Sequence, residues 1–586
     1  VGLAALTALT VFIIAAAYSR IIEEFPHGGG GYVVATKLLG EKWGVVSGNA
    51  LLVDYILTIT VSIAASGDAL FSFLPAAWHV WKLPFEVAAI VGLTALNIRG
   101  VRESVMAMLP IFLVFLVTHV AVVLGGIIAH APEVHATATA VHQGFRGGLQ
   151  TMGVGGMLLL FAHAYSLGGG TYTGIEAVSN GMAIMREPRV HNGRKTMAYM
   201  ATSLAFTAGG LLVCYLLWHV GPVEGKTLNA VLLEKMAGGS ALGRAFIVVT
   251  LFSEGALLVV AAQAGFLDGP RVLANMAVDS WVPHRFAALS ERLTTGNGIV
   301  LMGTAALAAL LYTGGDVGHL VVMYSINVFL TFSLSMFAMA RSWFRRRAEV
   351  EHWKRRCGLF VIGFLLCATI LVITSVEKFT EGGWITLVVT GSLVCLCYAI
   401  RAHYRTVGEK LGELYKQLGS IPCAVDAPHT PPDPKKPTAV VMVGSYGGLG
   451  IHTVLNIFRV FPGHFKNLVF VSVGVVDSGG FKGEDAIDAL KERTEKTLEQ
   501  YVQLACGLGI PAASRYAVGT DAVEEADKLC RDLAREYHGA TFFAGKVIFR
   551  RERWYQRFLH NETAYLVQKR LQWAGLTMVI LPAKVQ

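Results

Sequence analysis

Long apolar runs fill residues 1–400 of the chain. They lie at residues 1–19, 43–73, 85–98, 106–130, 154–182, 196–220, 244–267, 297–312, 318–340, 358–375 and 383–400. Each run is long enough, or nearly so, to cross a hydrocarbon layer of about 30 Å as a helix. Because a backbone in lipid must satisfy its own hydrogen bonds, the pattern predicts an all-α polytopic membrane domain at residues 1–401, with about eleven spans.

Residues 437–586 follow a different pattern, in which short apolar runs alternate with amphipathic helical segments. Strands are expected at 438–444, 467–476, 513–519, 540–546 and 576–582, with helices between them. Alternating β and α units predict a parallel sheet that helices cover on both faces. We interpret residues 402–436 as a short amphipathic helix followed by a Pro-rich linker.

Composition and charge agree with a membrane protein. The chain is 54% hydrophobic and only 15% charged, whereas soluble domains carry about a quarter charged residues. The net charge of +9 does not indicate nucleic-acid binding. If the loops are numbered in chain order from the one after the run at 1–19, the basic residues gather in the odd-numbered loops, above all in RSWFRRRAEVEHWKRR at 341–356. By the positive-inside rule these loops, and residues 437–586 with them, are cytoplasmic in a plasma-membrane protein. The chain would then start outside, which predicts a further helix upstream of Val1.

The eight cysteines show neither zinc-ligand spacing nor a disulfide framework. No catalytic motif stands out, so we expect a protein that is not an enzyme. The acidic residues inside the apolar runs are the informative ones, because a carboxylate in a membrane span is costly and marks a candidate functional site.

Asp54 lies in the middle of the run LLVDYILTITVS. Thr58 and Ser62 follow at i+4 and i+8, so the three side chains share one helix face. Such a stripe offers only oxygen atoms, which are the ligands that hard cations prefer. Asp54 has no basic partner in its own span, which favours a cation-facing stripe. The alternative for the two hydroxyls is that they bond back to carbonyls of their own helix.

The stretch LGGGTYTGIEAVSNG at 167–181 interrupts another apolar run. Gly168, Gly169 and Gly170 can break the helix and free backbone carbonyls, as the discontinuous helices of secondary transporters do. Thr173 and Glu176 follow the break, and Glu176 either binds a cation or carries a proton. The alternative is that the glycines only permit close helix packing.

Two further residues inside apolar runs carry open interpretations. Glu254, in TLFSEGALLVV, has no role that the sequence assigns. Tyr324 lies early in the run at 318–340, where a tyrosine is either a membrane-interface residue or, if it faces a cavity, a ligand.

Three segments resemble one known family. The run EFPHGGGGYVVATKLLGEKWGVVSGNALLVDYILTITVSIAASGDALFSFLP, with NIRGVRES and TGIEAVSNG, is similar to KimA-type potassium importers. These belong to the KUP family within the amino acid–polyamine–organocation permease superfamily. The similarity covers the whole chain, including the soluble tail. The glycine motifs recur across amino-acid permeases, so they indicate the superfamily more strongly than the substrate.

The resemblance implies an inverted-repeat, LeuT-like permease fold with twelve spans, potassium–proton symport and a homodimer formed through the C-terminal domain. It implies no cofactor beyond the transported ions. Potassium would be held by Asp54 and Glu176, and the ion ligands that match the family's motifs are Asp54, Thr58, Ser62, Thr173, Glu176 and Tyr324. The family's first helix supplies further ligands, and this chain, which starts at the second helix, has no match for them.

The tail resembles a universal-stress-protein-like domain, which in KimA-type importers is tied to dimerisation and to inhibition by cyclic di-AMP. The glycine motif of nucleotide-binding stress proteins is absent, so ATP binding in their manner is not expected. Gly444 and Gly447, in GSYGGLG after the first strand, and Arg550 and Arg551 are candidate phosphate contacts. The alternative for the arginines is a solvated basic face.

The sequence therefore predicts a proton-coupled potassium importer that works by alternating access. An amino-acid or polyamine permease of the same fold is the alternative. A third hypothesis is a membrane-tethered nucleotide sensor whose transport domain is inactive.

Overall fold

The chain folds into two compact units, seen in a computed structural model. The model describes the whole chain except residues 1, 29, 101–103, 173, 238, 290–294, 350, 419–429, 477–483, 550–558, 560, 561 and 586. The first unit comprises Val1–Leu273 and Gly298–Cys395, and the second comprises Ala274–Asn297 and Leu396–Gln586.

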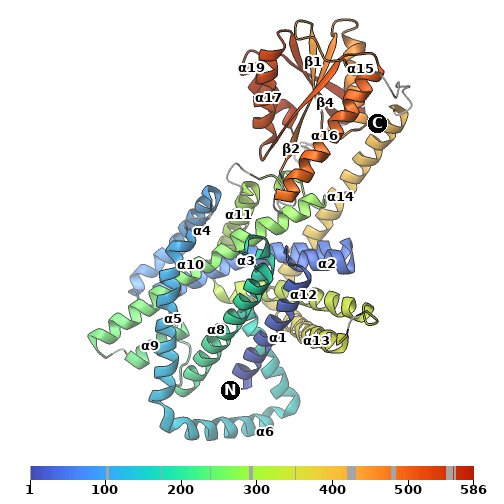
Figure 1. Ribbon diagram of the computed structural model, residues 1–586. Helices are drawn as coiled ribbons and strands as arrows, with labels where there is room; N and C mark the ends of the chain where they lie inside the picture. Colours follow the sequence, from blue (N-terminus) through green and yellow to red (C-terminus); the bar gives the residue numbers. More distant parts are fainter. Residues whose placement is uncertain are drawn as a thin grey trace. The chain divides into compact units, whose positions relative to one another are not determined.

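The first unit is built from helices, two of which continue into the second unit (Figure 1). In chain order they are α1 Gly2–Glu24, α2 Gly31–Leu39, α3 Glu41–Phe71, α4 Lys82–Arg99, α5 Ser104–Ala129, α6 Val134–Leu167, α7 Ile175–Asn180, α8 Arg189–Leu217, α9 Leu228–Ala237, α10 Ala241–Val278, α11 Gly296–Thr313, α12 Val317–Arg345, α13 Trp353–Glu377 and α14 Trp384–Leu418. Within the described residues, 10 helices are long and apolar enough to cross a membrane, or 11 if one bent pair counts as a span. The predicted polytopic helical domain is confirmed.

Helices α3 and α12 form the centre of this unit. Their most apolar windows are 78% and 72% buried, whereas no other candidate span exceeds 44%. The two helices pack against each other, and α12 also packs against α2 and α13. A helix that is apolar on all sides is suited to such a buried position, so a polar side chain on α3 or α12 faces protein rather than lipid.

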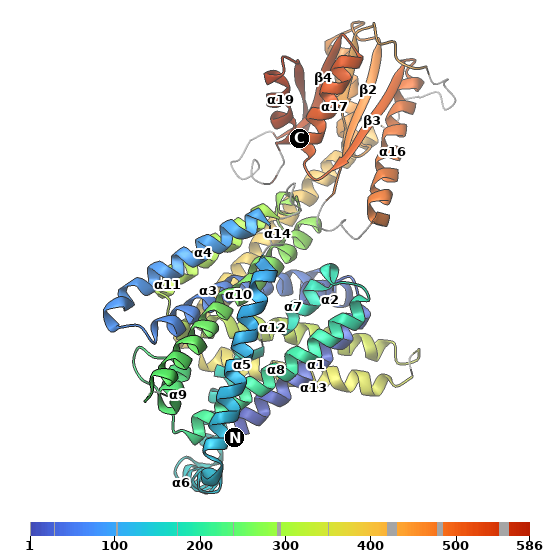
Figure 2. The same ribbon diagram turned by 60° about the vertical axis from the view of Figure 1, so that its left-hand side comes forward.

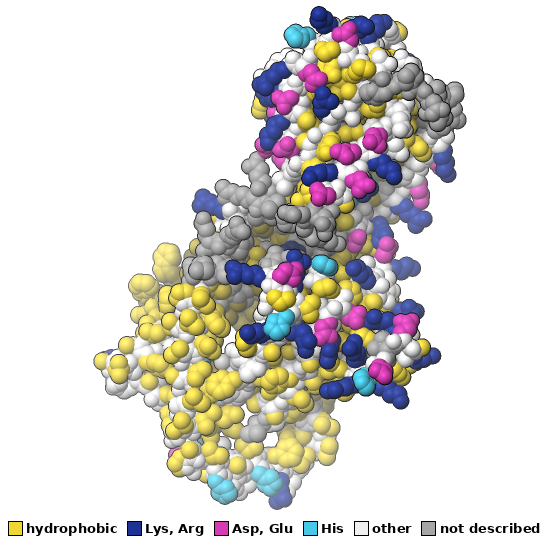
Figure 3. All heavy atoms as spheres, viewed as in Figure 1, with side chains coloured by type: hydrophobic (Ala, Val, Ile, Leu, Met, Phe, Trp, Pro, Cys, Tyr) yellow, Lys and Arg dark blue, Asp and Glu magenta, His cyan; other side chains and the backbone are white. Residues whose placement is uncertain are grey.

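Basic residues of the fifth and ninth loops lie close to the end of α1. Arg194, at the start of α8, lies 3.0 Å from Glu23 of α1, and Arg346, after α12, lies 3.1 Å from Glu24. Figure 3 shows Lys and Arg side chains around α2 and the α12–α13 connection, while hydrophobic side chains cover most of the rest of this unit in that view. This grouping agrees with the charge pattern of the sequence.

Two features differ from the sequence-based prediction. Helix α14 is continuous from Trp384 to Leu418, so the last apolar run and the predicted amphipathic helix form a single helix. No proline interrupts this segment, and Arg405 and Glu409 add an i,i+4 ion pair at 2.9 Å. Helix α2 was not expected, because GYVVATKLL is too short to stand out as an apolar run. Most of the Pro-rich spacer, at 419–429, lies outside the described residues.

The second unit contains a parallel five-stranded sheet, in the order β3-β2-β1-β4-β5. The strands are β1 Thr438–Met442, β2 Asn467–Val475, β3 Ala512–Gly519, β4 Ala540–Phe549 and β5 Met578–Val585. Helices α15 Gly448–Val460 and α16 Glu484–Gly507 cover one face, and α17 Ala522–Glu536 and α19 Thr563–Trp573 cover the other (Figure 2). The predicted parallel sheet with helices on both faces is confirmed.

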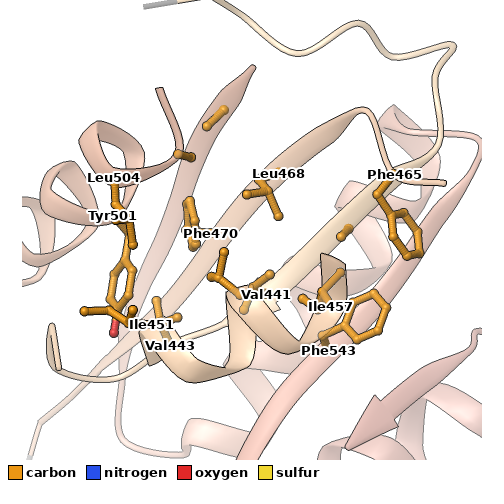
Figure 4. Packing of buried hydrophobic residues seen from close by; sticks show 14 of the residues in the cluster. Val441, Val443, Ile451, Ile457, Phe465, Leu468, Phe470, Tyr501, Leu504 and Phe543 are labelled. Carbon is orange, nitrogen blue, oxygen red and sulfur yellow. The ribbon is translucent and has the colours of Figure 1, made fainter. Parts of the chain in front are cut away.

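Alternating residues of the strands fill the two cores of this sheet. Val441, Phe470 and Phe543 pack on the α15–α16 side, whereas their neighbours Val440 and Phe542 pack on the other. Figure 4 shows the first of these cores, where the rings of Tyr501 and Phe470 stack with centroids 5.2 Å apart.

Candidate functional site

The glycine stretch breaks its helix, as the sequence predicts. Helix α6 ends at Leu167, a 3-10 turn covers Gly168–Tyr172, and α7 starts at Ile175. The two helical pieces are bent by 43°. Gly174, directly before α7, has φ of 84°, a left-handed conformation that glycine adopts without the cost that a Cβ adds. The break therefore brings Glu176, in the first turn of α7, into the interior of the unit.

Glu176 is 95% buried and bonds to the backbone of α2. Its Oε1 accepts a hydrogen bond of 2.6 Å from the N–H of Gly31, the first residue of that helix. Its Oε2 lies 3.5 Å from Oγ1 of Thr331 on α12. Helix N-termini carry unpaired N–H groups and a partial positive charge, so α2 stabilises an anion here without a basic side chain.

Asp54 lies on α3 and is also buried, with 8% of its surface exposed. Its Oδ1 has no hydrogen-bond partner in the described structure. The hydroxyl of Thr58 donates to the Asp54 carbonyl at 2.9 Å, so the back-bonding alternative holds for Thr58. Thr58 retains its oxygen lone pairs as acceptors, and Ser62 is buried one further turn along the helix.

A small cavity joins Asp54 and Glu176. It has a volume of about 20 Å³, and Thr58, Gly174 and Phe332 help to line it. About one water-sized sphere fits into such a volume. The predicted combination of Asp54, Thr58 and Glu176 is therefore found around one cavity.

The other predicted ligands differ in position. Tyr324, on α12, is 3% exposed and packs beside the helix break, with a ring carbon 4.0 Å from where a Cβ on Gly170 would lie. Tyr324 is thus a buried residue at the break rather than a membrane-interface residue. Thr173 lies outside the described residues.

A second group of oxygens surrounds the Glu176 carboxylate, and sequence reasoning missed it. A Cβ built on Gly31 would lie 2.8 Å from Glu176 Oε1, 3.0 Å from Ser47 Oγ and 3.3 Å from Ser335 Oγ. The hydroxyl of Ser47 is buried and has no hydrogen-bond partner among the described residues, whereas the buried Tyr18 hydroxyl lies within hydrogen-bonding reach of Glu176 and Ser335. These residues come from four helices, and a single serine or glycine in an apolar run carries no signal of its own.

Asp268 was also missed, because the predicted span ended at residue 267. Helix α10 continues to Val278, and Asp268 is 4% exposed, 3.5 Å from Arg271. It lies within electrostatic reach of Glu176 and Tyr55. A third carboxylate therefore borders the region of the cavity, with a basic partner that Asp54 and Glu176 lack in the described structure.

The glycine loop of the second unit is filled by a tyrosine. Tyr501 Oη donates to the Ser445 carbonyl at 3.0 Å and accepts from the Gly447 N–H at 3.3 Å. A Cβ on Gly450 would lie 1.9 Å from that oxygen, so Gly450 is needed for the ring to fit. Gly444 has open space around it. Arg550 and Arg551 lie outside the described residues.

Comparison with known proteins shows which family and which relatives this chain resembles. The model of the amino acid permease family matches residues 1–394. The potassium transporter KimA of Bacillus subtilis is 32% identical over 407 residues, which cover 69% of this chain and 64% of that protein. An uncharacterised transporter of Mycobacterium tuberculosis, Rv1999c, is 26% identical over 336 residues, covering 56% of this chain and 70% of that one.

Among solved structures, a manganese transporter of Eremococcus coleocola aligns with 68% of this chain and 86% of its own. The sequence identity is 13% and the TM-score is 0.37, which is too low to bear on the fold. The family match and the curated relatives are transporters, not enzymes. Because the family match covers the whole helical unit that holds the site, the chain belongs to the amino acid permease family of multi-pass membrane transporters.

Proposed function

We propose that this chain is a secondary transporter that imports potassium together with protons by alternating access. The observation that carries the proposal is that two buried carboxylates, Asp54 and Glu176, face one small cavity. No Lys, Arg or His from the described residues lines that cavity. Two buried carboxylates without a basic partner repel each other, so a cation between them stabilises the arrangement.

The ligand types around the cavity suit potassium. Carboxylate and hydroxyl oxygens of Asp54, Glu176 and Thr58 are available. Hard cations exchange their water for oxygens of this kind. A volume of about 20 Å³ holds a water-sized ion, whereas drug-sized ligands occupy clefts of about 300–1,000 Å³. The cavity in this conformation therefore favours a single ion over an amino acid or a polyamine.

The broken helix supports alternating access. Transporters with discontinuous helices hold their ions at the break and rock one helix bundle against another around it. Here α6 and α7 meet at such a break, and Asp54 on α3 faces it from the buried centre of the unit. Binding of a proton at a membrane carboxylate would reset the site for the next cycle. The similarity to a protein named potassium transporter supports potassium as the ion.

The same proposal assigns a regulatory role to the second unit. The basic odd-numbered loops support a plasma-membrane orientation in which the sheet domain is cytoplasmic. A homodimer through this domain, and cyclic di-AMP as its regulator, are the corresponding proposals for partner and ligand. The open backbone at Gly444 is available to a phosphate, whereas the Gly447 N–H already bonds to Tyr501.

Rubidium uptake by the full-length protein, in a host that lacks its own potassium uptake, tests the proposal. We expect uptake by the wild type and its loss in Asp54→Asn and Glu176→Gln, which keep side-chain size but remove charge. Glu133→Gln is the matched control, because Glu133 is exposed and pairs only with His130. Undiminished uptake by both site variants would refute the site. Wild-type uptake of a polyamine without rubidium would favour the alternative permease.

A further inference from the structure

A second buried polar cluster lies away from the cavity, between four helices of the first unit. Glu254 of α10, His119 of α5, Tyr215 of α8 and Asn229 of α9 converge there. The surrounding side chains are apolar, with Val122, Leu232 and Leu251 among the buried ones. Figure 2 shows α5, α8, α9 and α10 in this part of the molecule. None of these four residues lines the cavity between Asp54 and Glu176.

One oxygen of the Glu254 carboxylate is bound and the other is not. Tyr215 Oη donates to Asn229 Oδ1 at 2.5 Å, and Asn229 Nδ2 donates to Glu254 Oε1 at 2.8 Å. Glu254 Oε2 is buried and has no hydrogen-bond partner in the described structure. It lies 3.9 Å from Nε2 of His119, which is 2% exposed.

The backbone fixes the tautomer of His119. Its Nδ1 lies 3.0 Å from the Phe115 carbonyl oxygen, which can only accept, so Nδ1 carries a hydrogen. In the neutral imidazole Nε2 then has a lone pair, and that lone pair faces the unpaired Glu254 Oε2. Two acceptors opposite each other are unfavourable, and one added proton between them converts the contact into a hydrogen bond or an ion pair.

From this geometry we propose that Glu254 and His119 together bind one proton, and that this pair is the proton site of the transport cycle. The inference rests on the proposed proton-coupled import. The proton comes from water and is shared between Nε2 and Oε2, so no other bond forms or breaks. The protonated pair is neutral overall, which suits its apolar surroundings, whereas loss of the proton leaves a buried negative charge.

No neighbouring charge competes for this role among the described residues. On α8 the titratable group that faces Glu254 is Tyr215. Lys226, just before α9, pairs with Glu234 of α9, and Lys235 of α9 bonds to the Trp218 and His219 carbonyls. Helix α3 packs against α10 through Leu70 and Ser66 at Gly255, and its Asp68 is paired with Lys82.

The cluster links protonation to the position of α9. Asn229 is the contact between α9 and the carboxylate, and Tyr215 connects the same amide to α8. When the proton leaves, Oε2 and Nε2 repel each other. The carboxylate gains solvation by moving toward water, and this movement weakens its hydrogen bond with Asn229. Proton binding thus favours the position of α9 that the structure shows.

The test uses the purified full-length protein with three readouts: infrared titration of the protonated carboxyl band, proton movement in vesicles, and rubidium uptake. Glu254→Gln keeps the acceptor for Asn229 but cannot hold the proton. His119→Gln places a fixed amide donor opposite Oε2. Glu234→Gln is the matched control on α9, because its carboxylate is exposed and pairs only with Lys226.

We expect a protonated carboxyl band that titrates with pH in the wild type and the control, is lost in Glu254→Gln, and titrates over a different pH range in His119→Gln. Proton movement should fall by about tenfold or more in both cluster variants. An unchanged band and unchanged proton movement in both variants would overturn the inference. If the wild type takes up no rubidium, the proposed function fails, and the infrared titration still decides whether the pair binds a proton.

Discussion

The backbone N–H of Gly31 donates a hydrogen bond of 2.6 Å to Oε1 of Glu176, across 145 residues of sequence. This contact joins the start of α2 to the helix that follows the glycine break. It gives a buried carboxylate a partner at Oε1 without a basic side chain, while Oε2 lies 3.5 Å from Oγ1 of Thr331. The start of α2 and the helix after the glycine break therefore shape the candidate ion site together.

Replacement of Gly31 by alanine should damage this site directly. The added Cβ would lie 2.8 Å from Glu176 Oε1, so either α2 or the carboxylate must move. We expect a destabilisation of about 1–3 kcal/mol and a fall in rubidium uptake of about tenfold or more. Thermal unfolding and uptake measure the two effects. Gly92→Ala is the control, because nothing lies within 4 Å of its built Cβ; equal effects at both positions would contradict the argument.

The second prediction concerns Gly174, at the helix break. Its φ of 84° is strained for any residue with a Cβ, so Gly174→Ala should cost about 1–2 kcal/mol. Asparagine tolerates this conformation better, so Gly174→Asn should retain more uptake than Gly174→Ala. Gly168→Ala serves as the comparison, since its φ is −73° and its surroundings are open. The same loss in Gly168→Ala as in Gly174→Ala would show that conformation at Gly174 is not the cause.

In the second unit, Tyr501 should stabilise the glycine loop. Tyr501→Phe removes the bonds to the Ser445 carbonyl and the Gly447 N–H, at a cost of about 1–2 kcal/mol. Gly450→Ala should cost more, because its Cβ would displace the ring itself. Limited proteolysis of the full-length protein measures both effects. Gly444→Ala, with open space around it, should behave like the wild type, and similar proteolysis of all three variants would contradict this account.

His452 on α15 predicts a pH dependence of the second unit. Burial, together with the positive charge of Arg459, lowers the pKa of His452 below its ordinary value of 6.5. The unfolded chain therefore takes up a proton at a higher pH than the folded domain does. Stability is full above about pH 6.5 and falls as the pH drops toward the folded-state pKa.

His452→Gln tests this pH dependence. The variant should lose part of the fall in midpoint between about pH 7 and pH 5, measured by denaturant unfolding of the full-length protein. His538→Gln is a control, because His538 is an exposed residue of the turn before β4. A wild-type-like fall in the His452 variant would contradict the assignment.

The apolar periodicity was sufficient to predict both units and most helices, since length and burial are properties of single segments. Asp54 and Glu176 were predictable because a carboxylate in an apolar run is conspicuous. Ser47, Ser335 and Tyr18 were not, because their significance arises only when separate helices pack around Gly31. Asp268 was missed because the predicted span ended too early, and local sequence patterns place helix ends poorly. Helix α2 was missed because it is short.

The Glu254 cluster shows the same limit. The sequence shows Glu254 as one carboxylate among several, with its role open. Its partner His119 lies 135 positions earlier, on another helix, α5. Only the fold places the unprotonated nitrogen of that ring 3.9 Å from the carboxylate.

Equilibrium binding of rubidium to the purified full-length protein tests the central claim most directly, because it separates ion binding from transport. Binding should be saturable, competed by potassium rather than by a polyamine, and weakened by about tenfold or more in both Asp54→Asn and Glu176→Gln. Glu133→Gln should bind like the wild type. Wild-type affinity in both site variants would contradict the claim that these two carboxylates share one cation.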